Sequence, residues 1–236
     1  MSLFSLIKKD KEYWLVDQVK TVGKSSDDYT QEFAKILEEW KSEQIDYLSL
    51  LMDEEHEEWL MNHRFQKISS IVEFAKSLDK IEATEQSIEV ESLYESDLSD
   101  EQFAILYDRC RSGSANKNNL FSLEQIMESL LNELGSDWRK HCFIFSQDAQ
   151  QLGISIPHIE PGTIDEGRLF YFGVVPEHRG KGYGTIFHQR TLGLLKQIGA
   201  NTYVGSTDGS NEYMIRIFEH NGCYLRDRKG VYRINR

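Results

Sequence analysis

The sequence predicts a mixed α/β protein, with helices packed on a mixed sheet and the chain divided into two units. First, segments in which apolar and polar residues alternate are interleaved with segments of helical period. Second, a polar stretch at residues 77–85 separates an N-terminal αβ unit, residues 1–82, from a larger unit, residues 86–236. Third, a glycine-rich turn at residues 179–184 joins a strand directly to a helix in the larger unit.

The larger unit is predicted to have the element order βααβββαβαββ. Residues 88–93 largely alternate apolar and polar side chains, as a half-buried strand does. A helix over residues 100–110 presents one apolar face, with Asp97 or Ser99 as its cap. The further predicted elements, in chain order, are a helix at 122–134 that ends at Gly135, strands at 141–145, 152–158 and 168–175, a helix between Gly184 and Gly199, a strand at 202–206, a helix at 211–220, and strands near 223–226 and 231–234.

The N-terminal unit repeats the order of elements that ends the larger unit. A helix, a strand, a helix and a further segment are predicted at residues 33–40, 45–52, 55–63 and from Phe65 onward. Asp53 closes the strand here, as Asp208 does in the larger unit. Two interpretations stay open: a degenerate, truncated copy of the fold of the larger unit, or the chance recurrence of a short αβαβ order.

The composition predicts a soluble globular protein, since the chain is 39% hydrophobic and 28% charged with 3 prolines. No apolar run approaches the roughly 20 residues of a membrane span, and the N-terminus lacks the order of a signal peptide. We therefore expect a cytoplasmic protein without membrane association. Cys110, Cys142 and Cys223 are widely separated, and no pair of histidines has metal-ligand spacing, so we expect buried thiols and no metal site.

The charge distribution bears on the partners of the protein. A net charge of −12 argues against nucleic acid, because phosphate backbones are bound by positive surfaces. Residues 168–236 carry 11 Lys and Arg against 5 Asp and Glu, whereas residues 86–167 carry 5 against 15. The basic segment suits an anionic cofactor and the acidic segment a cationic amine, although solvated faces also produce such charge runs.

The glycine-rich turn is the part of the sequence that indicates chemistry. Residues 172–185 read Phe-Gly-Val-Val-Pro-Glu-His-Arg-Gly-Lys-Gly-Tyr-Gly-Thr, so a strand runs through the turn into a helix. Free amides and the positive helix end then point at one place, which is an anion site. A dinucleotide fingerprint would need glycine where Thr185 stands, and a P-loop would need Ser or Thr after Lys181.

This turn resembles the signature of the GNAT superfamily of acyl-CoA N-acyltransferases. Their (Arg/Gln)-x-x-Gly-x-(Gly/Ala) pattern, behind a Val-x-Pro-Glu turn, is matched by Arg179, Gly182 and Gly184. A second signature on the following helix is matched in register by residues 211–223, beginning with Asn211. The resemblance covers residues 86–236 and implies a GNAT-like acyltransferase fold.

The resemblance also implies acetyl-CoA (coenzyme A) as the cofactor, with its pyrophosphate on the amides of the turn. It implies that the strand before the turn separates from its neighbour and leaves amides for the pantetheine arm and the thioester carbonyl. For Met214 and Phe218, an ordinary core position is an equal alternative. The residues expected to bind the cofactor are Phe172, Gly173, Val174, Val175, Arg179, Gly180, Lys181, Gly182, Tyr183, Gly184, Thr185, Asn211, Met214 and Phe218.

Two positions in the region of the expected catalytic residues depart from the family pattern. Phe218 stands where many members have a tyrosine that protonates the thiolate, and Arg168 stands where a glutamate base often lies. The catalytic residues expected instead are Glu166 and Asp208 as bases and Tyr213 as acid, with His158 and Glu160 as further bases and Tyr183 as a further acid. A third alternative is that no acid is required, because a thiol with a pKa of about 8.5 is already a tolerable leaving group.

Two functions follow from this reading. The first is an N-acetyltransferase that moves a short acyl group from acetyl-CoA to a primary amine, which could belong to a small molecule or a peptide. The second is a non-catalytic acyl-CoA sensor in which residues 1–82 are a regulatory or interaction unit. The sequence leaves a homodimer open.

Overall fold

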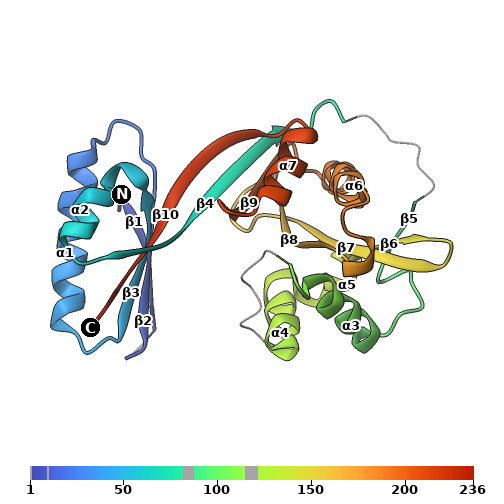
Figure 1. Cartoon of the computed structure of the whole chain (residues 1–236), viewed down its shortest axis with the longest axis horizontal. Coiled ribbons are helices and arrows are strands. Elements are labelled where there is room, and N and C mark those ends of the chain that lie inside the picture. Colours follow the sequence, from blue (N-terminus) through green and yellow to red (C-terminus); the bar gives the residue numbers. More distant parts are fainter. Residues whose placement is uncertain (1, 10, 82–87, 115–121) are drawn as a thin grey trace. The chain divides into compact units, whose positions relative to one another are not determined.

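The structure, a computed structural model, describes residues 2–9, 11–81, 88–114 and 122–236. These residues form two compact units, and the strands that pass between them can be followed in Figure 1. The first unit is Met1–Val72 with Asp208–Ser210 and Arg226–Arg236, and the second is Glu73–Thr207 with Asn211–Leu225. The boundary between the units, after Val72, therefore lies earlier in the sequence than the division between residues 82 and 86 that the polar stretch suggests. The C-terminal residues belong to the first unit because they pair with one of its strands.

The first unit is a sheet with two helices. Its strands β1 and β2 form an antiparallel hairpin, β2 and β3 are parallel, and the end of β10 pairs antiparallel with β3. The hairpin was not predicted, because the sequence of β1 lacks alternation of apolar and polar residues. The elements are β1 (Phe4–Lys9), β2 (Tyr13–Gln18), α1 (Ser26–Ser42), β3 (Tyr47–Asp53), α2 (Glu57–Asn62), β4 (Gln66–Ser77) and β10 (Tyr224–Asn235).

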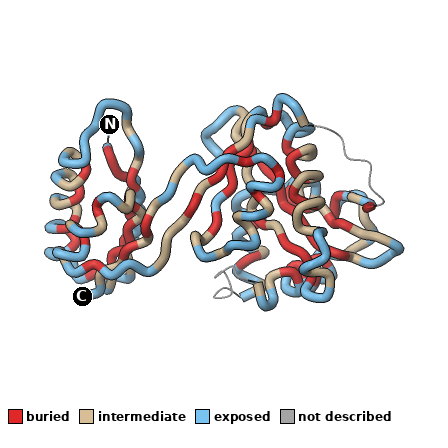
Figure 2. Tube along the Cα trace, turned by 45° about the horizontal axis from the view of Figure 1, so that its top comes forward, coloured by how far each residue is buried: buried red, intermediate tan, exposed pale blue. Residues whose placement is uncertain are grey.

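The core of the first unit lies between its helices and one face of its sheet. Helix α1 buries Tyr29, Phe33, Leu37 and Trp40, a stripe at helical spacing, against the strands. The buried residues follow the strands and the inner sides of the helices in Figure 2. The order helix, strand, helix, strand that the sequence predicts for this unit is confirmed by α1, β3, α2 and β4.

The second unit is a mixed sheet covered by helices on both faces (Figure 1). Its strand order is β4-β9-β8-β7-β6-β5, in which β5 to β8 are antiparallel and β8 and β9 are parallel. The elements are β5 (Glu89–Ser92), α3 (Asp100–Arg111), α4 (Leu123–Leu134), α5 (Trp138–His141), β6 (Phe143–Gln147), β7 (Gln150–Ile159), β8 (Glu166–Val174), α6 (Tyr183–Gln197), β9 (Thr202–Asp208) and α7 (Glu212–His220).

Two cores follow from the two faces of this sheet. Helices α3, α4 and α5 pack on one face around Phe103, Leu130 and Trp138, and α6 packs on the other around Phe145 and Phe187. The predicted strand from residue 141 begins instead at Phe143. The residues before it form helix α5, which places Trp138 in the core beneath α3 and α4. The two predicted C-terminal strands form one strand, β10.

The other predicted helices and strands of residues 86–236 are present with bounds shifted by a few residues. Ser99 and Ser122 each cap the next helix with a reciprocal bond to a glutamine three residues on. Residues 82–87, which include part of the predicted linker, lie outside the described residues. In the part of the chain that is described, no helix is long and apolar enough to cross a membrane.

Candidate active site

The turn between β8 and α6 has the backbone of an open loop. Pro176–His178 form one turn of 3-10 helix, after which Gly180 and Gly182 adopt φ of +73° and +86°. Only glycine adopts such angles without strain, so these two residues define the shape of the loop. A Cβ built on either glycine would meet no atom within 4 Å, so the space beside both is open.

Successive amides of this loop are left unpaired within the described chain. Among the described residues, no acceptor is bonded to the amides of residues 180–184, whereas the Arg179 amide donates to the Pro176 carbonyl (3.2 Å) and the Thr185 amide to the Gly182 carbonyl (3.2 Å). In the same described part, no side chain caps the N-terminus of α6. Consecutive unpaired amides at the positive end of a helix bind phosphate groups.

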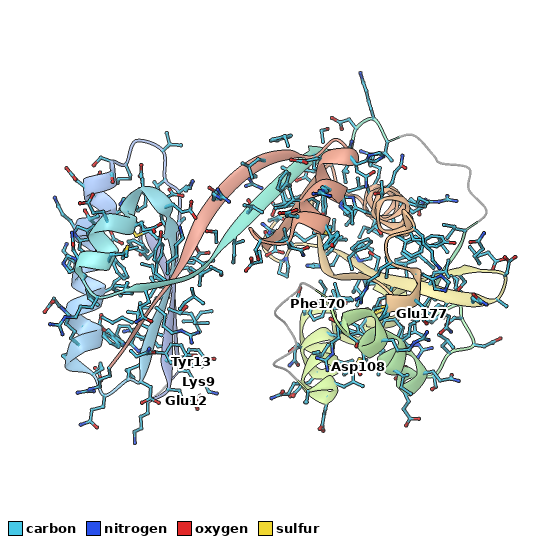
Figure 3. All side chains as sticks on the ribbon, in the orientation of Figure 1. Lys9, Glu12, Tyr13, Asp108, Phe170 and Glu177 are labelled. Atoms are coloured by element: carbon cyan, nitrogen blue, oxygen red, sulfur yellow. The ribbon has the colours of Figure 1, made fainter. Side chains whose placement is uncertain are left out.

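The loop is held in place from α3. The Arg179 side chain donates from Nε to the Val174 carbonyl (2.9 Å) and from Nη2 to the Cys110 carbonyl (2.7 Å). Glu177, labelled in Figure 3, forms an ion pair with Arg109 of α3. Arg179 is therefore engaged with main-chain carbonyls, and the exposed Lys181 is the cation on the rim of the loop.

The parallel strands β8 and β9 separate next to this loop. Within the described chain they pair only at Glu166↔Thr202 and Gly167↔Tyr203, although β8 continues to Val174 and β9 to Asp208. A bulge in β8 at Phe170, the residue labelled in Figure 3, interrupts its register with β7. The facing edges of β8 and β9 beyond Gly167 thus form an opening in the sheet.

The expected cofactor residues lie around this opening and the loop. Phe172 and Val174 face α6, while Gly173 has no room for a side chain, since a Cβ would stand 2.7 Å from the Tyr171 hydroxyl. The Val175 amide is bonded to the Leu152 carbonyl (2.9 Å). The Tyr183 hydroxyl donates to Gln147 Oε1 (2.9 Å).

The expected residues of α7 have structural partners. Asn211 caps the helix by accepting from the Met214 amide (3.2 Å) and donates to Thr207 Oγ1 (3.0 Å). Phe218 is 1% exposed and stacks on Phe74 of β4, with ring centroids 5.1 Å apart. Gly184 allows α7 to pack on α6, because a Cβ there would stand 2.8 Å from Ile217 Cδ1.

Acidic side chains surround Arg168 at the start of β8. Its guanidinium lies 2.7 Å from Glu166, 3.3 Å from Glu160 and 3.5 Å from Glu73 of β4. Ser206 of β9 donates to the same Glu73 carboxylate across 3.5 Å. The cluster therefore links β4, β8, β9 and the residue that follows β7, near the end of the opening where β8 and β9 are still paired.

A buried histidine adjoins this acidic cluster. His158 is 4% exposed, and its Nε2 lies 3.1 Å from Glu133 of α4 and 3.7 Å from Glu160. Burial lowers the pKa of His158 despite the charge of Glu160, and burial raises the pKa of Glu133. The imidazole is therefore neutral at physiological pH and able to accept a proton.

The three residues expected to be catalytic are not brought together. Glu166 lies in the acidic cluster, as do His158 and Glu160. Asp208 ends β9 and accepts from the amide and hydroxyl of Ser210, and it belongs to the first compact unit. Tyr213 is 77% exposed on α7.

A row of hydrogen-bonded, buried polar side chains, which the sequence pattern did not indicate, lies under the opening. Tyr203 Oη lies 3.1 Å from His188 Nε2, and His188 Nδ1 lies 2.9 Å from Asn221 Nδ2. His188 is fully buried, and burial with the nearby charge of Lys76 lowers its pKa to about 3. The available signal was the position of His188 between Phe187 and Thr191 on the inner face of a helix.

The three cysteines are buried and unpaired, as expected. Burial raises the pKa of Cys110 to about 12 and that of Cys223 to about 11, so neither is a reactive thiolate. No group of three or more metal-ligating side chains is found among the described residues.

Comparison with known proteins places this geometry in a family. A model of the acetyltransferase (GNAT) family matches residues 101–223. A GCN5-related N-acetyltransferase from Sphaerobacter thermophilus is similar in structure, with a TM-score of 0.71 at 13% identity over 98% of this chain and 76% of that one. No curated protein is significantly similar in sequence.

Two further solved structures share the fold over the whole chain. A GNAT-family acetyltransferase from Colwellia psychrerythraea has a TM-score of 0.65 at 13% identity, over 99% of this chain and 81% of that one. A tandem GNAT protein from the clavulanic acid biosynthesis pathway has a TM-score of 0.62 at 13% identity, over 99% and 79%. These structures show the fold, and the family model, which covers more than half of the sequence, shows that the chain belongs to the GNAT acetyltransferase family.

Proposed function

We propose that the second unit transfers an acetyl or other short acyl group from acyl-CoA to a primary amine. The observation that carries this proposal is the row of unpaired amides at residues 180–184, at an uncapped helix N-terminus beside the separated strands β8 and β9. The pyrophosphate would bind these amides, and Lys181 would add charge at the rim.

The thioester would then lie along the open edge of β8. Beyond Gly167 this edge has no partner strand among the described residues, so its main-chain groups are available to a ligand that lies between β8 and β9. Residues 172–174 end this edge next to the phosphate site. An amide held rigidly there would stabilise the negative charge that develops on the thioester oxygen during attack.

The acceptor amine would enter through the acidic cluster. Glu73, Glu160 and Glu166 surround Arg168, and Glu133 lies beside His158, so this end of the opening carries excess negative charge. A negative surface concentrates cationic amines. The amine must lose a proton before attack, and the neutral His158 with its carboxylate neighbours is the base that we assign.

Calorimetry with CoA and acetyl-CoA, followed by a thiol-release assay, tests the proposal. The amine panel would comprise spermidine, an aminoglycoside, free lysine and a peptide with a free N-terminus. We expect micromolar CoA binding, thiol release with at least one cationic amine, and loss of that release in His158→Gln. Absence of CoA binding would refute both the donor and the site.

A second function, an acyl-CoA sensor, is favoured by one observation. Phe218 occupies a fully buried core position and has no hydroxyl group to donate to a thiolate. A sensor would bind acetyl-CoA in the calorimeter and release no thiol with any amine of the panel. The same two measurements therefore separate the two functions.

A further inference from the structure

The orientation of the hydrogen bonds in the buried chain of Tyr203, His188 and Asn221 can be derived from one carbonyl. Asn221 Nδ2 donates to the Thr185 carbonyl (3.0 Å), and a carbonyl can only accept. The side-chain nitrogen of Asn221, and not its oxygen, therefore faces the Thr185 carbonyl. The second hydrogen of this nitrogen points to His188 Nδ1 (2.9 Å). His188 Nδ1 is thus an acceptor and carries no proton.

The tautomer of His188 then determines whether the Tyr203 hydroxyl accepts or donates in its hydrogen bond to the imidazole. An imidazole that is neutral and unprotonated on Nδ1 carries its hydrogen on Nε2, so Nε2 donates to Tyr203 Oη (3.1 Å). The phenol oxygen is the acceptor of that bond, and its own hydrogen is left to donate. No acceptor for this hydrogen is found in the described part of the chain.

The Tyr203 hydroxyl lies where the two parallel strands separate. Tyr203 and Gly167 are the last pair between β9 and β8, and the phenol extends along β9 as far as Gly205. A Cβ on Gly205 would stand 2.1 Å from the hydroxyl, so glycine is needed there to make room for it. The same Cβ would stand 3.0 Å from Phe218 Cε1, so the ring edge of Phe218 and the Tyr203 hydroxyl meet at one place.

Aromatic rings and a lysine hold His188 and Asn221 in place beside Tyr203. The imidazole of His188 is contacted by the rings of Phe172 from β8 (5.9 Å between centroids) and Phe218 from α7 (5.5 Å). On the other side, Lys76 of β4 donates to the Asn221 carbonyl (2.6 Å). One edge of the opening thus contributes Phe172 and the other contributes Tyr203, with His188 beneath both.

We propose that Tyr203 is the proton donor to the departing thiolate, with His188 and Asn221 as positioning residues; this inference rests on the proposed acyl transfer. The amine nitrogen bonds to the thioester carbon, and when the carbon–sulfur bond breaks its electron pair goes to sulfur. The Tyr203 proton passes to that sulfur and gives free CoA. The proton lost by the nitrogen returns through water to the phenolate, which the His188 Nε2 hydrogen stabilises meanwhile.

Tyr203→Phe is the first test, since it removes only the hydroxyl. We expect kcat for the best amine of the panel to fall by at least about tenfold, with the Kd for CoA close to wild type. The melting temperature should also fall, because the buried His188 Nε2 hydrogen loses its acceptor. Tyr107→Phe, which removes a buried hydroxyl on the α3 face, is the matched control and should leave kcat unchanged. An unchanged kcat in Tyr203→Phe would overturn the proposal.

A rescue experiment distinguishes the chemical role from a structural one. Because the ring edge of Phe218 and the Tyr203 hydroxyl meet beside Gly205, a tyrosine at position 218 brings a hydroxyl to the same region. We expect Phe218→Tyr to restore most of the kcat that Tyr203→Phe loses. His188→Gln, which keeps an N–H donor, should retain more activity than His188→Leu at equal CoA affinity. A defect that neither substitution relieves contradicts the assignment.

Binding measurements test the inference without an acceptor amine. A hydroxyl that donates to sulfur should make CoA bind about fivefold tighter than desulfo-CoA, the energy of one ordinary hydrogen bond. In Tyr203→Phe the two ligands should bind equally. If the preference persists in the variant, Tyr203 does not contact sulfur. If wild-type protein binds neither ligand, the proposed function itself fails.

Discussion

The two units contain the same strand–helix–strand segment, and they differ in how many main-chain groups that segment leaves unpaired. In the first unit α1 connects the parallel strands β2 and β3, as α6 connects β8 and β9 in the second. The antiparallel hairpin β1–β2 also corresponds to β7–β8. The order of elements in the first unit thus agrees with a repeat of the second.

The parallel strands differ in how far they remain paired. Strands β2 and β3 pair at five successive positions, from Tyr13↔Tyr47 to Asp17↔Leu51, whereas β8 and β9 pair at two. A continuous ladder uses the main-chain groups of both strands, so the first unit has none to offer a ligand along this seam. The separation of β8 and β9 is therefore a feature of the second unit and not of the repeated segment.

The helix N-termini differ in the same sense. Ser25 caps α1 by accepting from the Asp28 amide, and the Asp28 carboxylate accepts from the Ser25 amide (2.9 Å). Asp27 and Asp28 also place negative charge in the first turn of α1. An anion is excluded there by occupied amides and by like charge, whereas α6 presents glycines and free amides. The loop and the strand separation therefore distinguish the second unit from the first, and they are the two features on which the proposed cofactor site depends.

The largest expected effect concerns His188, a fully buried histidine of the second unit. The pKa of His188 is lowered to about 3, below the unfolded value near 6.5, so the unfolded chain binds the proton more tightly. Stability from the neutral imidazole is complete above pH 6.5 and is lost as pH falls toward 3. We expect the unfolding free energy of wild type, relative to His188→Gln, to drop by about 3 kcal/mol between pH 7 and pH 4 in urea titrations.

His56 is the histidine of the first unit whose acid sensitivity can be compared with that of His188. Burial lowers its pKa as well, but the charges of Glu55 and Asp53 oppose the shift, whereas Lys76 adds to it at His188. His56→Gln should therefore change the acid sensitivity in the same direction and by less. An equal or larger effect at His56 would show that the His188 environment is more polar than the structure indicates.

The next effect distinguishes the two loops. Gly182 and Gly23 occupy the β8–α6 and β2–α1 connections with nearly equal φ, +86° and +81°, and a Cβ on either meets nothing within 4 Å. Aspartate at either position carries the same backbone strain, but only at 182 does it add charge beside the proposed phosphates. We expect Gly182→Asp to raise the Kd for CoA at least about tenfold, or roughly 1.4 kcal/mol, by calorimetry.

Gly23→Asp is the matched control and should leave CoA affinity within about twofold of wild type. If both substitutions weaken binding equally, the loss reflects strain or unfolding and not the loop at residues 179–184. If neither does, the cofactor binds elsewhere.

Hydrogen exchange tests the open seam directly. With saturating CoA, we expect amides in peptides covering residues 168–175 and 180–186 to exchange about tenfold more slowly, because the ligand occupies the edge and the loop. Peptides covering residues 13–25 should show no change, since that ladder and cap are already complete. Equal protection of both segments would indicate global stabilisation and refute a localised site.

The smallest expected effect comes from removing the N-cap of α1 in the first unit. Ser25→Ala should lower the unfolding free energy by about 1 kcal/mol, the usual contribution of an N-cap, and leave the Kd for CoA unchanged. Denaturant unfolding followed by circular dichroism measures the first quantity and calorimetry the second. A change in CoA affinity would mean that the first unit influences the binding site.

Much of the local structure could be predicted because its causes are local. The glycines at 180 and 182 need positive φ, and Ser99 and Ser122 each lie three residues before a glutamine partner. Helical and strand periods gave the order of elements from α1 to β4 and through most of the second unit. The nature of the loop between β8 and α6 followed from the same short-range rules.

Contacts between distant residues were decided by the tertiary structure alone. The pairing of β10 with β3 joins residues far apart in the chain, and the separation of β8 from β9 depends on a ladder that no single strand encodes. The hydrogen-bonded side chains of Tyr203, His188 and Asn221 come from separate segments of the sequence. The tautomer of His188 follows from a fourth residue, because the Thr185 carbonyl accepts from the Asn221 amide. Sequence by itself determined a glycine turn with positive φ that leads into an uncapped helix N-terminus, because backbone angle and helix polarity are local properties. Only the packed fold could decide which buried side chains lie beside it, because hydrogen bonds between them require positions that folding brings together.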